Sequence, residues 1–389
     1  MTGLTQALAA FVAAPTFGSN EQGALAVAKT GFMDTIATML AGHNEPVVNI
    51  VRQFFANATT PAEAPVPFLG TMHPAAQAAF ITAVAGHALD YDDVALSGHP
   101  STALVPAILA EGYLLNSSGL DALRAYVVGY EVWAELVSRE PDQYHLKGWH
   151  PTGVFGAVGA AAAVAYLRRL NVADTRQALA ISASLASGLV ANFGTMTKPF
   201  HAGRAAAHGI EAVRLSMLGM TSAPDVFEHQ AGYLNALSKA GRVDRTRPAD
   251  TLGKTLRILE TGLSIKRYPV CYSSHRTIDA VIKIVEAENL QPSEIKNVHV
   301  ITGVAQASML RNHRPVTGLE AKFSGEFAVA SALVAGKVGL AELTDEFVAR
   351  PAVREIMPKV RIATDATPCP IEPVFAMNDR VEIELRDGT

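Results

Sequence analysis

Three basic residues each stand directly before a proline that opens an apolar stretch: His99-Pro100, His150-Pro151 and Lys198-Pro199. Proline disfavours helical backbone in the residue before it and suits the first helical position, so each pair predicts a helix N-terminus. Helix N-termini attract anions through unpaired N–H groups and the helix dipole. Three such ends that converge would form a site for carboxylates. The alternative is that a His-Pro pair only marks a boundary between secondary-structure elements, and His73-Pro74 is a fourth such pair.

An acidic cluster precedes the first of the three pairs. Asp90, Asp92 and Asp93 lie at the C-terminal end of the helix predicted over residues 75–89. Carboxylates there repel one another and oppose the negative end of the helix. One interpretation is a Mg²⁺ site of a prenyl-diphosphate enzyme, although no second acidic motif appears. A second is that Asp90 or Asp93 pairs with His99 or a lysine, and a third is a solvated acidic turn.

Two further clusters are basic. Lys198, His201 and Arg204 are spaced three apart, which places them near one face of a helix that begins at Pro199. Thr197 adds a hydroxyl donor beside them. The segment from Lys266 to His275 carries two cations and a histidine at a predicted junction between domains, where ligand sites are favoured. The alternative for both is ordinary surface charge.

Composition limits the class of protein. The chain of 389 residues is 49% hydrophobic and 17% charged, which predicts two domains with sizeable cores. A net charge of −4 gives no basic face for nucleic acid. Cys271 and Cys369 fit neither a metal motif nor a disulfide framework, which favours a cytoplasmic location. The most apolar stretch, residues 153–167, is shorter than a bilayer span, so no membrane association is expected.

The periodicity predicts a large all-helical domain over residues 1–255 and a smaller α+β domain over residues 256–389. The predicted helices run over residues 75–89, 101–115, 120–138, 152–170, 174–189, 203–218, 274–288 and 320–335, and a capping box of Ser19 and Gln22 predicts another start. Strands are expected at residues 298–301 and 381–385. Asp387-Gly388, a dipeptide typical of β-hairpin turns, follows the second strand, but the sequence contains no return strand after it. We therefore expect the natural protein to continue beyond this sequence.

Six strings resemble the MmgE/PrpD family, in the family's order and from about residue 20 onward: HALDYDD, GHPSTALVPA, GWHPTGVFG, FGTMTKPFHAGRAA, KRYPVCYSSH and EAKFSGEF. This family contains dehydratases, decarboxylases and epimerases of small polycarboxylates. The resemblance implies a helical domain with an α+β lid domain, a cleft between them, a homodimer, and catalysis with neither an organic cofactor nor a metal.

The resemblance also implies roles for individual residues. Asp90, His99, His150, Lys198 and Lys266 match positions that line the family's active site, and His275 matches a substrate-contacting or supporting histidine. Asp93, Thr197, His201 and Arg204 lie in the same motifs and are expected to bind substrate. Phe327 stands where the family commonly has tyrosine, so any role of that hydroxyl is lost here.

The expected reaction is cofactor-independent chemistry at a carbon next to a carboxylate, with preorganised cations and N–H donors stabilising the charge that develops. His99 and His150 are the candidate base and acid, in an order that the sequence leaves open. A dehydratase-type lyase is the first prediction. An epimerase of a small dicarboxylate is the alternative, because the FGTMTKP string resembles the epimerase-like branch more than the decarboxylase. A non-catalytic scaffold protein is a further alternative, and it requires the lysines and histidines of these motifs to be ordinary surface groups.

Overall fold

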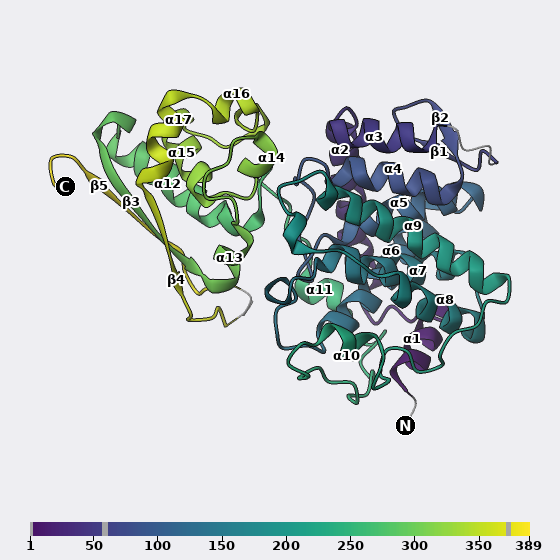
Figure 1. Ribbon diagram of the computed structural model, residues 1–389. Helices are drawn as coiled ribbons and strands as arrows, with labels where there is room; N and C mark the ends of the chain where they lie inside the picture. Colours follow the sequence, from purple (N-terminus) through teal and green to yellow (C-terminus); the bar gives the residue numbers. More distant parts are fainter. Residues whose placement is uncertain (1–2, 57–60, 371–374) are drawn as a thin grey trace. The chain divides into compact units, whose positions relative to one another are not determined.

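The computed structural model describes residues 3–56, 61–370 and 375–389, and divides the chain into two compact units (Figure 1). The first unit extends to Leu189 and resumes over Lys198–Ile265. The second comprises Val190–Thr197 and the chain from Lys266 onward. The division after Ile265 lies ten residues beyond the predicted boundary at residue 255.

The first unit is a bundle of helices with one short hairpin, β1 (Ala64–Val66) and β2 (Thr71–His73). Its helices are α1 (Leu4–Ala13), α2 (Glu21–Gly42), α3 (Pro46–Phe55), α4 (Ala75–His87), α5 (Pro100–Leu114), α6 (Gly119–Val137), α7 (Pro151–Leu167), α8 (Val172–Leu185), α9 (Thr197–Met217), α10 (Tyr233–Leu237) and α11 (Arg257–Thr261). The prediction of a mainly helical large domain is confirmed.

Helix α7 is buried on nearly all its faces and packs against α5, α6 and α8. Its small residues allow these helices to approach closely. A Cβ atom added to Gly129 of α6 would lie only 2.7 Å from the carbonyl oxygen of Gly159 in α7. The Ala- and Gly-rich stretch of the sequence therefore positions neighbouring helices, whose ends carry the site described below.

Helix α2 alone among the described helices has the length and apolar composition of a membrane span. In the structure one face of this helix, which includes Ala24, Ala28 and Gly31, is buried, and the helix contacts α4, α5 and α6. It is thus a helix of the bundle.

Two local predictions were wrong. Asn20 rather than Ser19 caps α2, because its side chain accepts a hydrogen bond from Gly23 N at 3.0 Å. The predicted helix over residues 320–335 is two helices, α14 (Gly318–Ala321) and α15 (Gly325–Ala335), since Ser324 caps the second. The predicted helix start at residue 75 is confirmed, and His73-Pro74 separates β2 from α4.

The second unit is an α+β fold, as predicted. Its three-stranded sheet has the order β4 (Val360–Asp365), β3 (Ile295–Gly303), β5 (Arg380–Leu385), with β3 parallel to β4 and antiparallel to β5. The helices α12 (His275–Glu288), α13 (Val304–Met309), α14, α15, α16 (Asp345–Val348) and α17 (Pro351–Ile356) complete the unit. Phe327 is fully buried in its core beside Phe347.

Candidate active site

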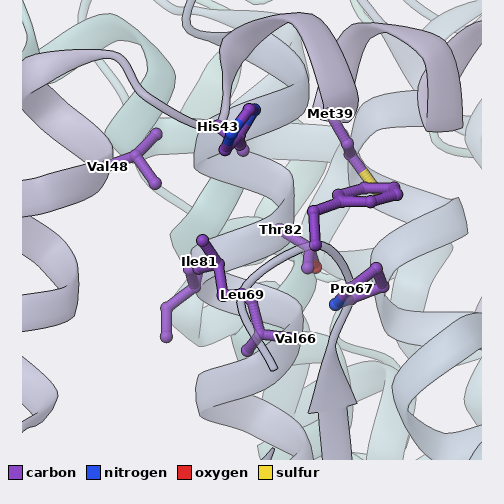
Figure 2. Close-up of a pocket in the computed structure, with 10 residues that line it drawn as sticks. Met39, His43, Val48, Val66, Pro67, Leu69, Ile81 and Thr82 are labelled. Atoms are coloured by element: carbon purple, nitrogen blue, oxygen red, sulfur yellow. The ribbon is translucent and has the colours of Figure 1, made fainter. Parts of the chain in front are cut away.

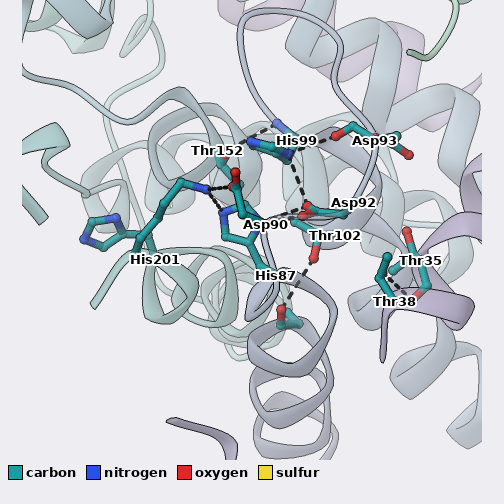
Figure 3. A network of polar contacts seen from close by, with 12 residues as sticks. Thr35, Thr38, His87, Asp90, Asp92, Asp93, His99, Thr102, Thr152 and His201 are labelled. Carbon is teal, nitrogen blue, oxygen red and sulfur yellow. Dashed lines mark hydrogen bonds and ion pairs between the residues drawn. The ribbon is translucent and has the colours of Figure 1, made fainter. Parts of the chain in front are cut away.

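Four imidazole rings, one ammonium group and two carboxylates meet inside the first unit. Figure 3 shows part of this group, with His87, Asp90, Asp92, His99 and His201 labelled. We call this group the histidine–lysine cluster: His87, Asp90, Asp92, His99, His150, Lys198 and His201. They come from the C-terminal end of α4, the loop after it, and the first turns of α5, α7 and α9.

Two of the predicted helix starts occur as expected. His99 and His150 are the N-cap residues of α5 and α7, each with proline at the first helical position. The His99 N–H donates to Thr152 Oγ1 of α7 at 3.1 Å, which ties the two helix ends together. Helix α9 begins at Thr197, so Lys198 lies in its first turn rather than before it. The N-terminal ends of α5 and α7 therefore lie side by side.

Lys198 bridges two other groups of the cluster. Its Nζ donates to Asp90 Oδ1 at 2.5 Å and lies 2.7 Å from His87 Nε2. Lys198 and Asp90 are each only 3% exposed. Asp90 has a φ of 52°, in the left-handed region that aspartate tolerates better than most residues. The predicted pairing of Asp90 with a lysine is thus confirmed.

Asp92 contacts two imidazole rings. Its oxygens lie 2.8 and 2.9 Å from His87 Nδ1, and Oδ2 lies 3.3 Å from His99 Nδ1. His99 Nδ1 is also 2.9 Å from the backbone oxygen of Asp93. Because carboxylate and carbonyl oxygens only accept hydrogen bonds, both Nδ1 atoms carry a proton. Nε2 of neutral His87 and His99 therefore bears a lone pair.

The ring of His150 contacts the rings of His87, His99 and His201. His150 Nδ1 lies 3.1 Å from His201 Nδ1, so one of these two atoms carries the proton that the bond needs. The rings of His87 and His150 are stacked at a centroid distance of 5.8 Å, and those of His99 and His150 are 6.4 Å apart. The side chain of His99 is 12% exposed, whereas that of His87 is fully buried.

Burial keeps three of the imidazoles, His87, His150 and His201, neutral. Burial, with the Lys198 charge acting in the same direction, lowers the pKa of His87 to about 3 and that of His201 to about 4. The same causes hold the pKa of His150 well below its usual value. Burial alone raises the pKa of Asp92, but His87 and His99 outweigh it and hold that pKa well below the usual value. At neutral pH the Asp92 carboxyl is thus ionised, whereas His87, His150 and His201 are neutral.

The three aspartates have separate surroundings. Asp90 contacts Lys198, and Asp92 contacts His87 and His99. Burial, with nearby Asp34 and Asp92, raises the pKa of the Asp93 carboxyl well above its usual value. These surroundings do not fit three carboxylates sharing one Mg²⁺ ion, so the prenyl-diphosphate interpretation is not supported. Within the described residues, the group with metal-ligand proximity is His87, Asp92 and His99, whose ligand atoms lie within 4.8 Å of one another.

The other predicted residues lie outside these contacts. Arg204 stacks on the rings of Phe80 and Phe200, at 5.6 and 5.9 Å from their centroids. Thr197 is exposed. Lys266 and His275 belong to the second unit, where Lys266 is buried and His275 lies between the rings of Tyr268 and Tyr272. Their predicted roles, and that of Asp93, stay predictions.

The predicted site residues did not include His87 and Asp92, although Asp92 was a candidate ligand in the Mg²⁺ interpretation. Their spacing of five residues across a helix end gave no periodic signal. The available signal was the motif itself, since both residues lie in the HALDYDD string. His145 was also missed, and its pKa is lowered to about 3 by burial, with His99 and Lys198 adding to the effect.

A small hollow elsewhere in the first unit has different chemistry (Figure 2). It is lined by residues of α2, α3, α4 and the β1–β2 hairpin: Met39, His43, Val48, Val66, Pro67, Phe68, Leu69, Ile81, Thr82 and Ala85. His43 is the only titratable side chain in this lining. The histidine–lysine cluster is therefore the better candidate for acid–base chemistry.

Comparison with known proteins agrees with the motifs. The model of the MmgE/PrpD N-terminal domain matches residues 6–246, and that of the C-terminal domain matches residues 268–389. The chain is similar to cis-aconitate decarboxylase of Homo sapiens, with 31% identity over 81% of this chain and 66% of the relative. It is 29% identical to the Mus musculus protein of that name over the same shares, and 27% identical to the one from Aspergillus terreus over 75% of this chain and 63% of the relative. The chain thus spans just under two thirds of the length of these relatives.

Proposed function

The chain belongs to the MmgE/PrpD family, and from this membership we propose that it is a lyase that acts on a small tricarboxylate at a carbon next to a carboxylate, without an organic cofactor. The observation that carries the proposal is the pairing of a buried ammonium group with imidazoles held neutral beside two helix N-termini. Such preorganised donors suit a transition state in which negative charge develops on a carboxylate.

His99 is the proposed base. Its Nδ1 proton is held by the Asp93 carbonyl, which leaves Nε2 to take a proton from the substrate. Asp92 Oδ2, 3.3 Å from Nδ1, would stabilise the imidazolium that then forms. His99 is also the most exposed imidazole among those paired with Asp92, so a substrate has access to it.

His150 is the proposed acid, and it takes up the proton that it donates only when substrate is bound. Burial and the Lys198 charge favour its neutral form, whereas a bound polycarboxylate adds negative charge that favours proton uptake. In a dehydration, the C–H bond breaks to His99, the C–O bond breaks, and the leaving hydroxyl takes the proton from His150 as water. The Lys198 ammonium and the N–H groups of α5 and α7 would stabilise the intermediate enediolate.

Two finer alternatives have specific support. The names of the relatives favour decarboxylation, in which the C–C bond to a carboxylate breaks and the carbanion takes a proton. An epimerase needs proton carriers on two sides of one carbon, and the His99 and His150 rings are separated by 6.4 Å. Dehydration remains the first prediction because it uses both a base and an acid. Lys266 and His275 are proposed contributors on the resemblance alone.

Proton NMR in D₂O separates these outcomes. The purified protein is incubated with citrate-like, aconitate-like and aspartate-derived acids. Loss of water, loss of CO₂ and C–H exchange without net reaction give different spectra. We expect a lyase reaction with a tricarboxylate, its loss in His99→Asn, and its retention in the control His43→Asn, which lies in the apolar hollow. Absence of any reaction in the wild-type protein, or full turnover in His99→Asn, would overturn the proposal.

A further inference from the structure

We propose that Asp92 and His87 are positioning residues, which fix the direction of the Lys198 ammonium group without touching substrate themselves. The inference rests on the proposed function, because it assumes that Lys198 acts in the reaction. Neither residue was among the predicted site residues. Both ring nitrogens of His87 are engaged by protein groups, Nδ1 by Asp92 and Nε2 by Lys198, and the Asp92 oxygens are engaged by His87 and His99.

The hydrogen bonds of the chain Asp92–His87–Lys198 are consistent in only one proton arrangement. Both Asp92 oxygens lie within 2.9 Å of His87 Nδ1, and a carboxylate accepts only. The proton of neutral His87 is therefore on Nδ1, and Nε2 is an acceptor. An ammonium group donates only, and Lys198 Nζ lies 2.7 Å from that Nε2. Asp92 thus sets the tautomer that Lys198 needs.

The arrangement also requires a neutral His87. Burial and the neighbouring Lys198 charge oppose its protonation strongly enough that it stays an acceptor through the neutral range. Asp90 supplies the counter-charge to Lys198 from a different direction, at 2.5 Å. Two acceptors, one at the end of α4 and one in the loop that follows it, define the orientation of the ammonium group. A single acceptor would leave the flexible four-carbon stem free to swing about one contact.

The position of Lys198 matters because catalysis by a fixed charge depends on its distance from the reacting atoms. A displacement of about 1 Å in a catalytic group costs on the order of 10²-fold in rate. If His87 and Asp92 only filled space or stabilised the fold, the effect of a His87 substitution on kcat would depend only on the size and polarity of the new side chain. If they position Lys198, the location of the acceptor atom decides the outcome.

Two substitutions of His87 separate these roles. In His87→Asn the amide is near the former Nδ1 and can still contact Asp92, but nothing reaches Lys198. In His87→Gln the amide oxygen reaches the former Nε2 position and can accept from Lys198. We expect kcat to fall about 10²-fold in His87→Asn with little change in KM, and to stay within about tenfold of wild type in His87→Gln. Melting temperatures should fall by similar amounts in both, because each leaves a polar amide in the same buried place.

Nitrogen-15 NMR of the histidine side chains tests the same inference without turnover. In the wild-type protein His87 should show a protonated Nδ1 and a bare Nε2. In Asp92→Asn the amide can accept or donate, so a mixed or reversed tautomer is expected, as for a histidine whose orienting aspartate is neutralised. The fold of each variant is checked by circular dichroism.

The outcomes distinguish this proposal from the one on function. Equal losses of kcat in the Asn and Gln variants, or a wild-type His87 protonated on Nε2, would overturn the positioning role. A wild-type protein inactive on every acid would overturn the proposed function, while the NMR tautomer would still decide whether Asp92 orients His87 toward Lys198.

Discussion

At the scale of single residues, burying the Lys198–Asp90 ion pair costs desolvation free energy, and the same pair supplies the ammonium group of the proposed reaction. Both groups are almost fully withdrawn from water, and a buried pair of this kind recovers its desolvation cost only while both partners are present. The consequences of removing one partner or both are therefore different, and they separate stability from activity.

Lys198→Met should destabilise the first unit by about 3 to 5 kcal/mol, because it leaves the Asp90 carboxylate buried without its cation. The double variant Asp90→Asn/Lys198→Met removes both charges and should recover most of that loss. Neither protein should turn over substrate. Urea unfolding monitored by circular dichroism measures the stabilities, and a double variant as unstable as Lys198→Met would contradict this account of the pair.

His201 gives a pH dependence of defined sign. Burial, with Lys198 adding to it, lowers its folded-state pKa to about 4, whereas the unfolded chain titrates near the ordinary value of about 6.5. Below pH 6.5 only the unfolded state takes up this proton. The contribution of His201 to stability is therefore complete above pH 6.5 and is lost as the pH falls toward 4, at about 1.4 kcal/mol per pH unit.

The variant His201→Gln should lack this component, so its free energy of unfolding should fall less steeply between pH 6.5 and 4. Burial raises the pKa of Glu131 to about 7, which stabilises the fold below pH 4.5 and is lost as the pH rises toward 7. That opposite effect is common to both proteins and cancels in the difference. Parallel pH profiles of the two proteins would show that His201 is not kept neutral by the fold.

The sequence predicted part of this residue-scale picture. His99, His150 and Lys198 were predicted from a local rule about proline, and the structure places all three in the cluster. The sequence predicted that Asp90 or Asp93 pairs with a histidine or a lysine, but which aspartate has which partner could not be predicted, because it depends on how the loop after α4 turns. Asp90, Leu96 and Ser97 all have positive φ values, which no periodic pattern in the sequence indicates.

At the scale of elements, the residue at which a helix begins was easier to predict than the elements that pack against that helix. Local capping chemistry sets a helix start, as at His99 and His150. Strand β4 was missed because its alternation of apolar and polar residues ends after Ile362, and only Val360 of its residues is buried. The helix packing was predicted only in kind, as close contact through small residues, because the crossing points depend on three-dimensional register.

Gly129 and Gly119 in α6 form a matched pair that tests this packing. Gly129→Ala places a methyl group 2.7 Å from the Gly159 carbonyl oxygen and 2.8 Å from Leu104 Cδ2, so it should cost about 1 to 3 kcal/mol by forcing α6 from α7. Gly119→Ala meets nothing within 4 Å and should be neutral or slightly stabilising. Chemical denaturation of both variants measures the difference, and equal stabilities would contradict the close α6–α7 contact.

At the scale of the whole molecule, the sequence predicted an all-helical part and an α+β part. The structure has a helical unit that also contains the short β1–β2 hairpin, and an α+β unit. The periodicity changed near residue 255, whereas the compact units divide after Ile265, with Val190–Thr197 also in the second unit. A segment that joins a unit from far away in sequence leaves no mark in local composition. The homodimer and the cytoplasmic location stay predictions.

The two units have separate hydrophobic cores, one around α7 and one around β3 and α15. Each core is large enough to unfold cooperatively, so calorimetry of the intact chain should resolve two transitions. Val158→Ala in α7 and Val298→Ala in β3 each remove buried methyl groups from one core only. Each should cost about 2 kcal/mol and lower one transition by about 4 to 8 °C while leaving the other in place. If both transitions moved together in either variant, the units would unfold as one, and variants in the second unit would then affect the histidine–lysine cluster through global stability alone.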